Sequence, residues 1–174
     1  EASRIAGVAV SYPALYLPEG GKVNPATLCA SYAGGLNIAT QAPEGGIVVN
    51  AHGASIPADD TLSWLPVHTV RGQITQVRAT PESEKIKTNL CYGGYMSPAF
   101  AGTHVVGSTF QKWLSDTRAV EADDESNLAK LKEAVPCLPA FEVIGHRAAL
   151  RTSAKDRFPV IGAIPEDGSY ITAA

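Results

Sequence analysis

The sequence predicts an α+β domain, with a largely antiparallel or mixed sheet and flanking helices on one side. Three observations lead to this fold class. Several segments rich in β-forming residues are separated by glycine turns, and two shorter stretches carry the start and stop signals of helices. Residues 141–162 then read as a long strand that ends in a charged turn and an apolar exit.

Composition narrows the class of protein without naming a function. The chain has 174 residues, of which 45% are hydrophobic, and a net charge of -3, which suits one well-packed globular domain. Its 14 lysines and arginines do not indicate nucleic-acid binding, so a polyanionic partner needs a local patch or another domain. No apolar run approaches the roughly 20 residues of a membrane helix. The three widely spaced cysteines fit reduced thiols in the cytoplasm better than disulfides or a zinc site.

The first third of the chain is expected to hold a hairpin, a helix and a buried strand. Residues 14–17 and the residues after Gly20–Gly21 have the pattern of a short hairpin. Asn24 can cap a helix whose first position is a proline, so a helix is predicted over residues 25–33. The continuous apolar run at residues 46–51 predicts a strand that is buried on both faces.

The rest of the chain is expected to supply most of the sheet and the clearest helix. Residues 66–80 are rich in β-formers without clean alternation, which indicates a bent or partly covered pair of strands. Further strands are predicted near residues 86–92, after a Gly93–Gly94 turn, and at residues 103–110. Residues 123–135 predict a helix, because acidic residues at its start suit the helix dipole and apolar residues recur at helical spacing.

Two arginines in the predicted strand over residues 141–151 suggest a binding role. The two-residue period of a strand turns Arg147 and Arg151 to the same face, roughly 13 Å apart, among small and apolar neighbours. A cation on such a face is costly to bury unless an anion meets it, and a guanidinium binds a carboxylate through two parallel hydrogen bonds. A substrate carboxylate is one such anion. The alternative is a structural ion pair of Arg151 with Asp156 or Glu142.

The order of several segments resembles one known family. In chain order the segments are LYLPEGGKVNPATLC, IVVNAHGAS, PVHTVRGQI, LCYGGYMSP, HVVGSTF, EADDESNLAKL and RAALRTSAKDRFPVIGAIP. Together they resemble the D-amino-acid-oxidase-like family of FAD-dependent amine oxidoreductases over about residues 15–165. The most specific parts are the arginine strand with its turn, and the VRGQ and CYGGYMSP pieces.

The chain departs from the family pattern at three points. It has no G-x-G-x-x-G dinucleotide fingerprint, it lacks the C-terminal flavin-binding segment, and its passage over residues 34–46 is short. We therefore expect residues 1–174 to be a single fragment of a longer protein, inactive alone. The resemblance implies a substrate-binding domain with a partial remnant of the FAD-binding domain at about residues 24–55.

Within the family, the pieces are most similar to members that modify the wobble uridine of tRNA and carry a fused methyltransferase domain. That similarity implies an enzyme with FAD as cofactor and tRNA as partner, which oxidatively removes the carboxymethyl group of 5-carboxymethylaminomethyl(-2-thio)uridine. Two alternatives stay open: an oxidase of a free amino acid, such as glycine or a D-amino acid, and a non-catalytic α+β binding module. Neither a membrane nor a metal is expected as a partner, since the histidines lack metal-ligand spacing.

The resemblance also implies roles for individual residues. Arg151 is expected to bind the substrate carboxylate near the flavin, and Arg147 to be structural or a rim charge. Tyr92 and Tyr95 would bound the substrate pocket and donate a hydrogen bond, with packing in the sheet as the alternative. Cofactor contacts are expected at the ADP part of FAD and beside the isoalloxazine, from Ala51, His52 and Gly53 and from Gly72 and Gln73 respectively. For Gln73 the alternative is an ordinary sheet glutamine.

Overall fold

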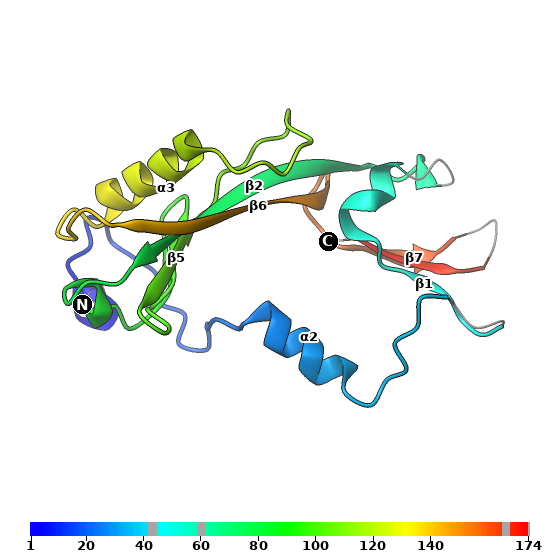
Figure 1. Cartoon of the computed structure of the whole chain (residues 1–174), viewed down its shortest axis with the longest axis horizontal. Coiled ribbons are helices and arrows are strands. Elements are labelled where there is room, and N and C mark those ends of the chain that lie inside the picture. The colour runs from blue at the N-terminus through cyan, green and yellow to red at the C-terminus, as the bar shows by residue number, and fades with distance from the viewer. Residues whose placement is uncertain (42–44, 59–61, 165–167, 174) are drawn as a thin grey trace.

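Two β-sheets and three α-helices make up the described part of the protein, which is residues 1–41, 45–58, 62–164 and 168–173 of a computed structural model. The larger sheet has five strands in the order β3-β4-β5-β2-β6, and every neighbouring pair is antiparallel. Its strands are β3 (Leu90–Cys91), β4 (Tyr95–Met96), β5 (Thr103–Gly107), β2 (Val67–Arg78) and β6 (Val143–Ala154). The predicted α+β class with a largely antiparallel sheet is therefore confirmed (Figure 1).

The smaller sheet joins distant parts of the chain. In it, β1 (Val49–Asn50) is parallel to β8 (Tyr170–Ala173), and β8 is antiparallel to β7 (Val160–Ala163). The prediction that residues 46–51 form a strand buried on both faces is wrong. Only two of those residues are in a strand, and Val49 is 58% exposed, because β1 is an edge strand of a small sheet.

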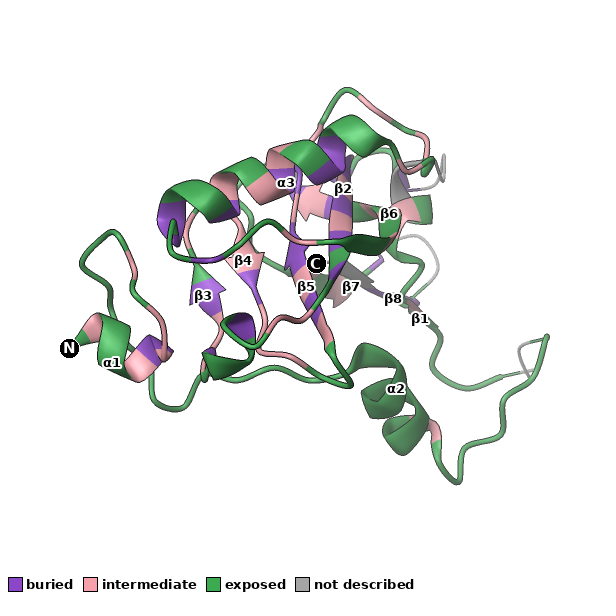
Figure 2. Ribbon diagram, turned by 60° about the vertical axis from the view of Figure 1, so that its left-hand side comes forward, coloured by how far each residue is buried: buried purple, intermediate pink, exposed green. Residues whose placement is uncertain are grey.

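The helices relate to the large sheet in different ways. α3 (Glu121–Ala134) lies along one face of the sheet, close to the predicted bounds (Figure 2). α2 (Pro25–Ala33) forms where predicted, with the Asn24 side chain accepting a hydrogen bond from the Thr27 amide at 3.1 Å, but it buries none of its residues. The expectation of helices flanking the sheet thus holds for α3 and not for α2.

The remaining helical segments are short. α1 (Ala2–Ala6) places Ala6 in the core. The 3-10 segments η1 (Gly53–Ala58) and η3 (Ser83–Lys85) precede β2 and β3 respectively. None of the helices in the described ranges is both long and apolar enough to cross a bilayer.

Two further predictions need correction. Residues 66–80 contain the single strand β2 rather than a bent pair, because β5 and β6 flank it and satisfy its backbone on both edges. Residues 14–17 do not form a hairpin, and the chain there makes only a turn in which the Gly20 amide donates to the Leu17 carbonyl at 3.0 Å. Leu15 and Leu17 are 86% and 65% exposed, so no apolar contact holds this segment in a sheet.

The strand β2 gives the large sheet two unlike faces. From Arg71 onward its buried residues alternate with less buried ones and are Arg71, Gln73, Thr75 and Val77, while Val70 is buried on the opposite face. α3 packs on the face that these residues form, called here the helix face. The opposite face, called the open face, carries Gly72 and Ile74 of β2, with Ala149 and Arg147 directly across the pairing with β6. α3 therefore covers the helix face of the sheet and not the open face.

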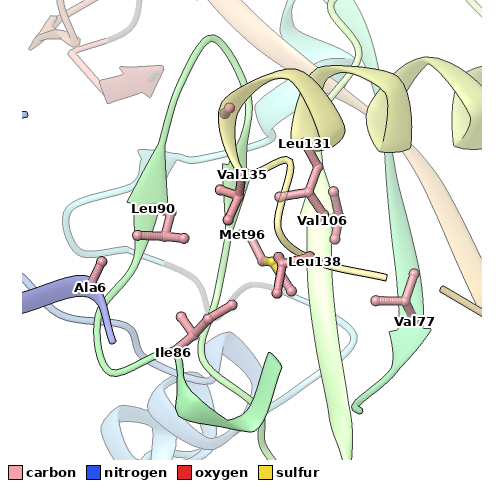
Figure 3. Close-up of a cluster of buried hydrophobic side chains, with 10 residues drawn as sticks. Ala6, Val77, Ile86, Leu90, Met96, Val106, Leu131, Val135 and Leu138 are labelled. Carbon is pink, nitrogen blue, oxygen red and sulfur yellow. The ribbon is translucent and has the colours of Figure 1, made fainter. Parts of the chain in front are cut away.

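The hydrophobic core lies between α3 and the helix face (Figure 3). Val77, Met96 and Val106 come from three different strands and are fully buried. Leu131 and Val135 close the core from the end of α3, which confirms the apolar spacing read from the sequence. Full burial of each such side chain contributes about 1.5–3 kcal/mol, so this contact fixes the C-terminal half of α3 to the sheet.

A polar network fixes the N-terminal half of α3. Arg71 is 1% exposed, and its Nη1 donates to the Asp123 carboxylate at 2.5 Å. The Gln73 side chain holds the residue before the helix, since it donates to the Val120 carbonyl at 2.8 Å and accepts from the Val120 amide at 2.9 Å. Gln73 also donates to Asp124 at 2.9 Å. Acidic residues that were expected only to suit the helix dipole are thus buried partners of the sheet.

Asp124 is the second charged centre of this network. Burial raises its pKa, but hydrogen bonds from Thr75, His146 and Gln73 together lower it more, so the net shift of its pKa is downward. The bonds from Thr75 Oγ1 and from His146 Nδ1 measure 2.7 and 2.9 Å. The carboxylate therefore stays ionised and keeps accepting from both strands of the helix face.

Removing one partner of the buried ion pair is expected to destabilise the protein strongly. Arg71→Met leaves the Asp123 carboxylate buried without its cation, which costs about 3–5 kcal/mol. The free energy of unfolding, measured by urea denaturation, should fall by about that amount. The matched control is Arg78→Met on the same strand, because the Arg78–Glu142 pair is 61% exposed on both sides and should contribute little.

A double variant tests the assignment further. Arg71→Met combined with Asp123→Leu removes both charges and should recover much of the loss. Equal unfolding free energies for Arg71→Met and Arg78→Met would show that the buried pair does not hold α3.

Candidate functional site

Arg151 stands on the open face near the end of β6, and its side chain is exposed. Its guanidinium carbon lies 5.2 Å from the centroid of the Phe110 ring, close enough for a cation–π contact. Its Nη2 lies 3.5 Å from Ser108 Oγ, which is a long hydrogen bond. These contacts orient the guanidinium without using up its donors.

The alternative that Arg151 pairs with Asp156 or Glu142 is wrong. Glu142 binds Arg78 at 2.6 Å, and Asp156 Oδ1 accepts from the Phe158 amide at 3.0 Å. Within the described ranges, Arg151 has no ion pair at all. Its charge is therefore available to an anion from outside.

Gly72 forms the floor under the Arg151 guanidinium. A Cβ atom at Gly72 would lie 3.1 Å from Arg151 Nη2 and 3.0 Å from the Thr109 carbonyl oxygen. Both distances are tighter than ordinary van der Waals contact, so the missing side chain lets the guanidinium lie against the strand. The structure thus brings Gly72 together with Arg151, while its predicted contact with a cofactor stays a prediction.

Tyr95 lies on the same face as Arg151. It pairs with Gly107 of β5, which in turn pairs with Ile74 of β2 on the open face. Burial raises the pKa of Tyr95, and the positive charge of Arg151 opposes that rise. The phenol is therefore neutral near pH 7 and available as a hydrogen-bond donor close to the guanidinium.

Tyr92 lies on the other side of the sheet. Its ring packs against the hydrophobic core, and its hydroxyl is buried with no hydrogen-bond partner among the described residues. Burial, and then the neighbouring Cys91 and Tyr95, raise the pKa of Tyr92. The two tyrosines predicted to bound one pocket thus face different sides of the sheet, and a role of Tyr92 in a substrate pocket stays a prediction.

Gln73 is also turned away from the open face. Its side chain is fully buried on the helix face, where it bonds to Arg71, Val120 and Asp124. A contact between this side chain and a flavin on the open face finds no support in that arrangement, because all its polar atoms are engaged.

Ala51, His52 and Gly53 form the exposed passage from β1 into η1. The Gly53 carbonyl accepts a hydrogen bond from the hydroxyl of Thr152, the residue after Arg151. The predicted cofactor turn is therefore tied to the strand that carries Arg151, although its contact with a cofactor stays a prediction.

A cleft of about 400 Å³ opens beside Arg151. Its lining is Phe110, Arg151, Thr152, Ser153, Ala154, Arg157, Phe158 and Pro159. Of the described residues, two arginines and no acidic residue line it, so its field attracts anions. Its volume is within the range of small-molecule sites, about 300–1,000 Å³. This cleft suits a ligand that carries a carboxylate.

The sequence did not predict a role in the site for three residues, Ser108, Phe110 and Arg157. Ser108 and Phe110 were expected to continue a strand, but β5 ends at Gly107 and the chain then turns toward Arg151. The available signal was the polar pair that follows the glycine and breaks the alternation. Arg157, expected only as part of a polar turn, lines the cleft.

Comparisons with known proteins give one family for the chain. The family model DAO, described as FAD dependent oxidoreductase, matches residues 35–174. A protein from Idiomarina loihiensis, the "tRNA 5-methylaminomethyl-2-thiouridine biosynthesis bifunctional protein MnmC", is 29% identical over 99% of this chain and 33% of its own length. The protein of the same name from Chromobacterium violaceum is 32% identical over 92% of this chain and 29% of its own length. The chain spans about a third of the curated relatives it matches.

Solved structures agree on the fold. Glycine oxidase from Geobacillus kaustophilus superimposes with a TM-score of 0.65 at 24% identity, over 74% of this chain and 35% of that one. Iminodiacetate oxidase from Chelativorans sp. BNC1 gives a TM-score of 0.62 at 21% identity, over 75% of this chain and 37% of that one. At these identities the likeness concerns the fold alone.

Substituting Gly72 is expected to disturb the open face measurably. Gly72→Ala brings a Cβ against the Arg151 guanidinium and the Thr109 carbonyl, and such overpacking costs about 1–3 kcal/mol. A crystal structure should find the guanidinium shifted off the strand, and urea denaturation should report the lost stability. Gly162→Ala is the matched control, since a Cβ there meets nothing within 4 Å. An unmoved guanidinium with unchanged stability would contradict the tight fit.

Proposed function

The chain belongs to the FAD dependent oxidoreductase family, and on that premise we propose that it forms the substrate-binding part of an enzyme that oxidises an amine carrying a carboxylate. The observation that carries the proposal is the Arg151 guanidinium, which faces the cleft with no acidic partner among the described residues. A guanidinium in that state suits the planar carboxylate of an amino acid or of a glycine-like substituent.

The proposed substrate is the wobble uridine of tRNA that carries a 5-carboxymethylaminomethyl group. Support comes from the relatives named for biosynthesis of tRNA 5-methylaminomethyl-2-thiouridine, whose length this chain matches only in part. Their description as bifunctional supports a second, methyltransferase activity in the same protein. A tRNA substrate in turn implies work in the cytoplasm.

The open face fits the flat ring system of a flavin. Gly72 and Gly107 leave it without side chains at two neighbouring strands, and a Cβ at Gly107 would meet Ile74 at 3.1 Å. We assign the ring contact to this face, and a contact with the ADP part to the turn at Ala51–Gly53. No glycine-rich fingerprint is present for the pyrophosphate, so those contacts are not assigned to this chain.

The proposed reaction divides the chemistry between cofactor and protein. When bound, FAD supplies the acceptor for two electrons from the carbon next to the substrate nitrogen. The balanced change takes R–NH–CH2–COO⁻, water and the oxidised acceptor to R–NH2, glyoxylate and the reduced acceptor. Arg151 would hold the carboxylate so that the reacting C–H bond has one orientation, and Tyr95 would donate a hydrogen bond at the same face.

A free amino acid is the second candidate substrate. The support is the likeness to structures named glycine oxidase and iminodiacetate oxidase, since Arg151 would bind the carboxylate of either ligand equally well. The two candidates differ in whether the amine carries a nucleoside, so activity on modified tRNA and on free amino acids separates them.

The holoenzyme is expected to release glyoxylate from tRNA that carries 5-carboxymethylaminomethyl-2-thiouridine. Glyoxylate is measured as its hydrazone, and the 5-aminomethyl product by mass spectrometry of the digested nucleosides. Glycine, iminodiacetate and D-alanine are the control substrates. Glyoxylate from the first two and pyruvate from D-alanine, each measured as its hydrazone, should not exceed background. Activity on these alone would sink the tRNA assignment, and a purified protein without bound FAD would favour a non-catalytic binding module.

Truncation of Arg151 is expected to weaken substrate binding without releasing the cofactor. Arg151→Ala removes a charge-assisted contact of about 1.5–3 kcal/mol, so KM should rise about 10- to 100-fold. Flavin absorbance should be unchanged, because the assigned contacts at Gly107 and at the Ala51–Gly53 turn are kept. Arg147→Ala is the matched control: it lies on the same face four residues earlier and should alter KM little. An unchanged KM for Arg151→Ala would refute the proposed contact between Arg151 and the substrate carboxylate.

A further inference from the structure

The cleft holds a second cation that the proposed function leaves unused. Arg157 lines it together with Arg151 and has no ion pair among the described residues. Its backbone has a φ of 67°, in the left-handed region that disfavours residues with a Cβ. Strained positions of this kind concentrate at binding sites, so the conformation directs attention to this side chain.

The nearest acid in the chain does not neutralise Arg157. Asp156 accepts a hydrogen bond from the Phe158 amide at 3.0 Å, which closes the turn, and it does not line the cleft. Two guanidinium groups in one concave site repel each other and strengthen the positive field. A ligand with a single carboxylate on Arg151 satisfies only one of them. The charge balance therefore points to a ligand with a second anionic group.

Each arginine of the cleft has a phenylalanine beside it, and the two rings differ in what they contact. The Phe110 ring contacts the Arg151 guanidinium, with 5.2 Å between the ring centroid and Arg151 Cζ. Phe158 follows Arg157 directly and is 71% exposed at the edge of the cleft. Exposed rings beside a cation are the usual platform for unstacked nucleic-acid bases, because every base has a π-face.

We propose that Arg157 and Phe158 form a nucleotide-recognition edge, in which Arg157 binds a backbone phosphate beside the modified base and Phe158 stacks on a base. The inference rests on the proposed function and names how a tRNA would be held at that same cleft. It also explains how an acidic chain could bind a nucleic acid. With a net charge of -3 the chain as a whole does not attract a polyanion, but this cleft is locally positive.

Salt dependence of binding tests the phosphate contact. The probe is a fluorescein-labelled anticodon stem-loop that carries the 5-aminomethyl product, which lacks the carboxylate and so does not report on Arg151. Anisotropy with the holoenzyme should find Arg157→Ala about tenfold weaker at 0.1 M salt, and the slope of log affinity against log salt smaller by about 0.7. Arg157→Lys should keep the slope.

Lys155→Ala is the matched control for the charge. Lys155 is exposed two residues away and does not line the cleft, so its loss should leave the affinity and the slope unchanged. Phe158→Leu should weaken binding about tenfold and leave the slope unchanged, as expected for lost stacking. Because Arg157→Ala keeps the Cβ, its backbone cost matches the wild type, and flavin absorbance checks that the variant is intact.

The outcomes separate this inference from the proposed function. If the wild-type holoenzyme releases no glyoxylate from the modified tRNA, the proposed function fails. If it does, but Arg157→Ala behaves like Lys155→Ala, only the recognition edge is refuted. The free modified nucleoside, which has no phosphate, should show the same KM with Arg157→Ala as with wild type. Weaker competitive inhibition of the nucleoside reaction by iminodiacetate in Arg157→Ala, together with unchanged stem-loop binding, would make the second anion a carboxylate and overturn the phosphate contact.

Discussion

The arrangement of the site depends on how β2 divides its side chains. Arg71 and Gln73 are committed to α3, through a buried ion pair with Asp123 and a saturated amide. A buried guanidinium is tolerated only with such partners, so this set of contacts fixes the register of the strand against the helix. Because neighbours on a strand alternate, Gly72 between them must face the other side. The floor beneath Arg151 is thus a consequence of the polar network behind it.

Local signals in the sequence were sufficient for several elements. Asn24 before a proline predicted α2, and the acidic start and apolar spacing predicted α3. The common face of Arg147 and Arg151 followed from the strand period alone, and the pairing with Ile74 and Val70 bears it out. Each of these inferences uses residues within a few positions of one another, where propensity and periodicity carry most of the information.

What failed needed long-range information. Tyr92 and Tyr95 are three positions apart around a glycine turn, and only the pairing of β3 with β4, and of β4 with β5, decides that they face opposite sides. Gln73 faces α3 because Arg71 and Asp123 meet there, a contact between residues 52 positions apart. The burial of Asp124 has the same origin. One residue of slip reverses a strand's faces, so site residues cannot be placed from sequence until the register is known.

Three arginines of this sheet illustrate what distinguishes a binding residue from a structural one. Arg71 is buried and ion-paired with Asp123, so its removal affects folding. Arg78 is exposed and already paired with Glu142, so neither folding nor ligand binding depends on it strongly. Arg151 is exposed, oriented by Phe110 and unpaired with any acid among the described residues, so water has access to its charge. A ligand that displaces that water from the cleft meets the charge in a less polar medium, where the attraction is stronger. Arg151 can bind an anionic ligand because no acid among the described residues pairs with it. Arg157 is also exposed at this cleft and without such a pair.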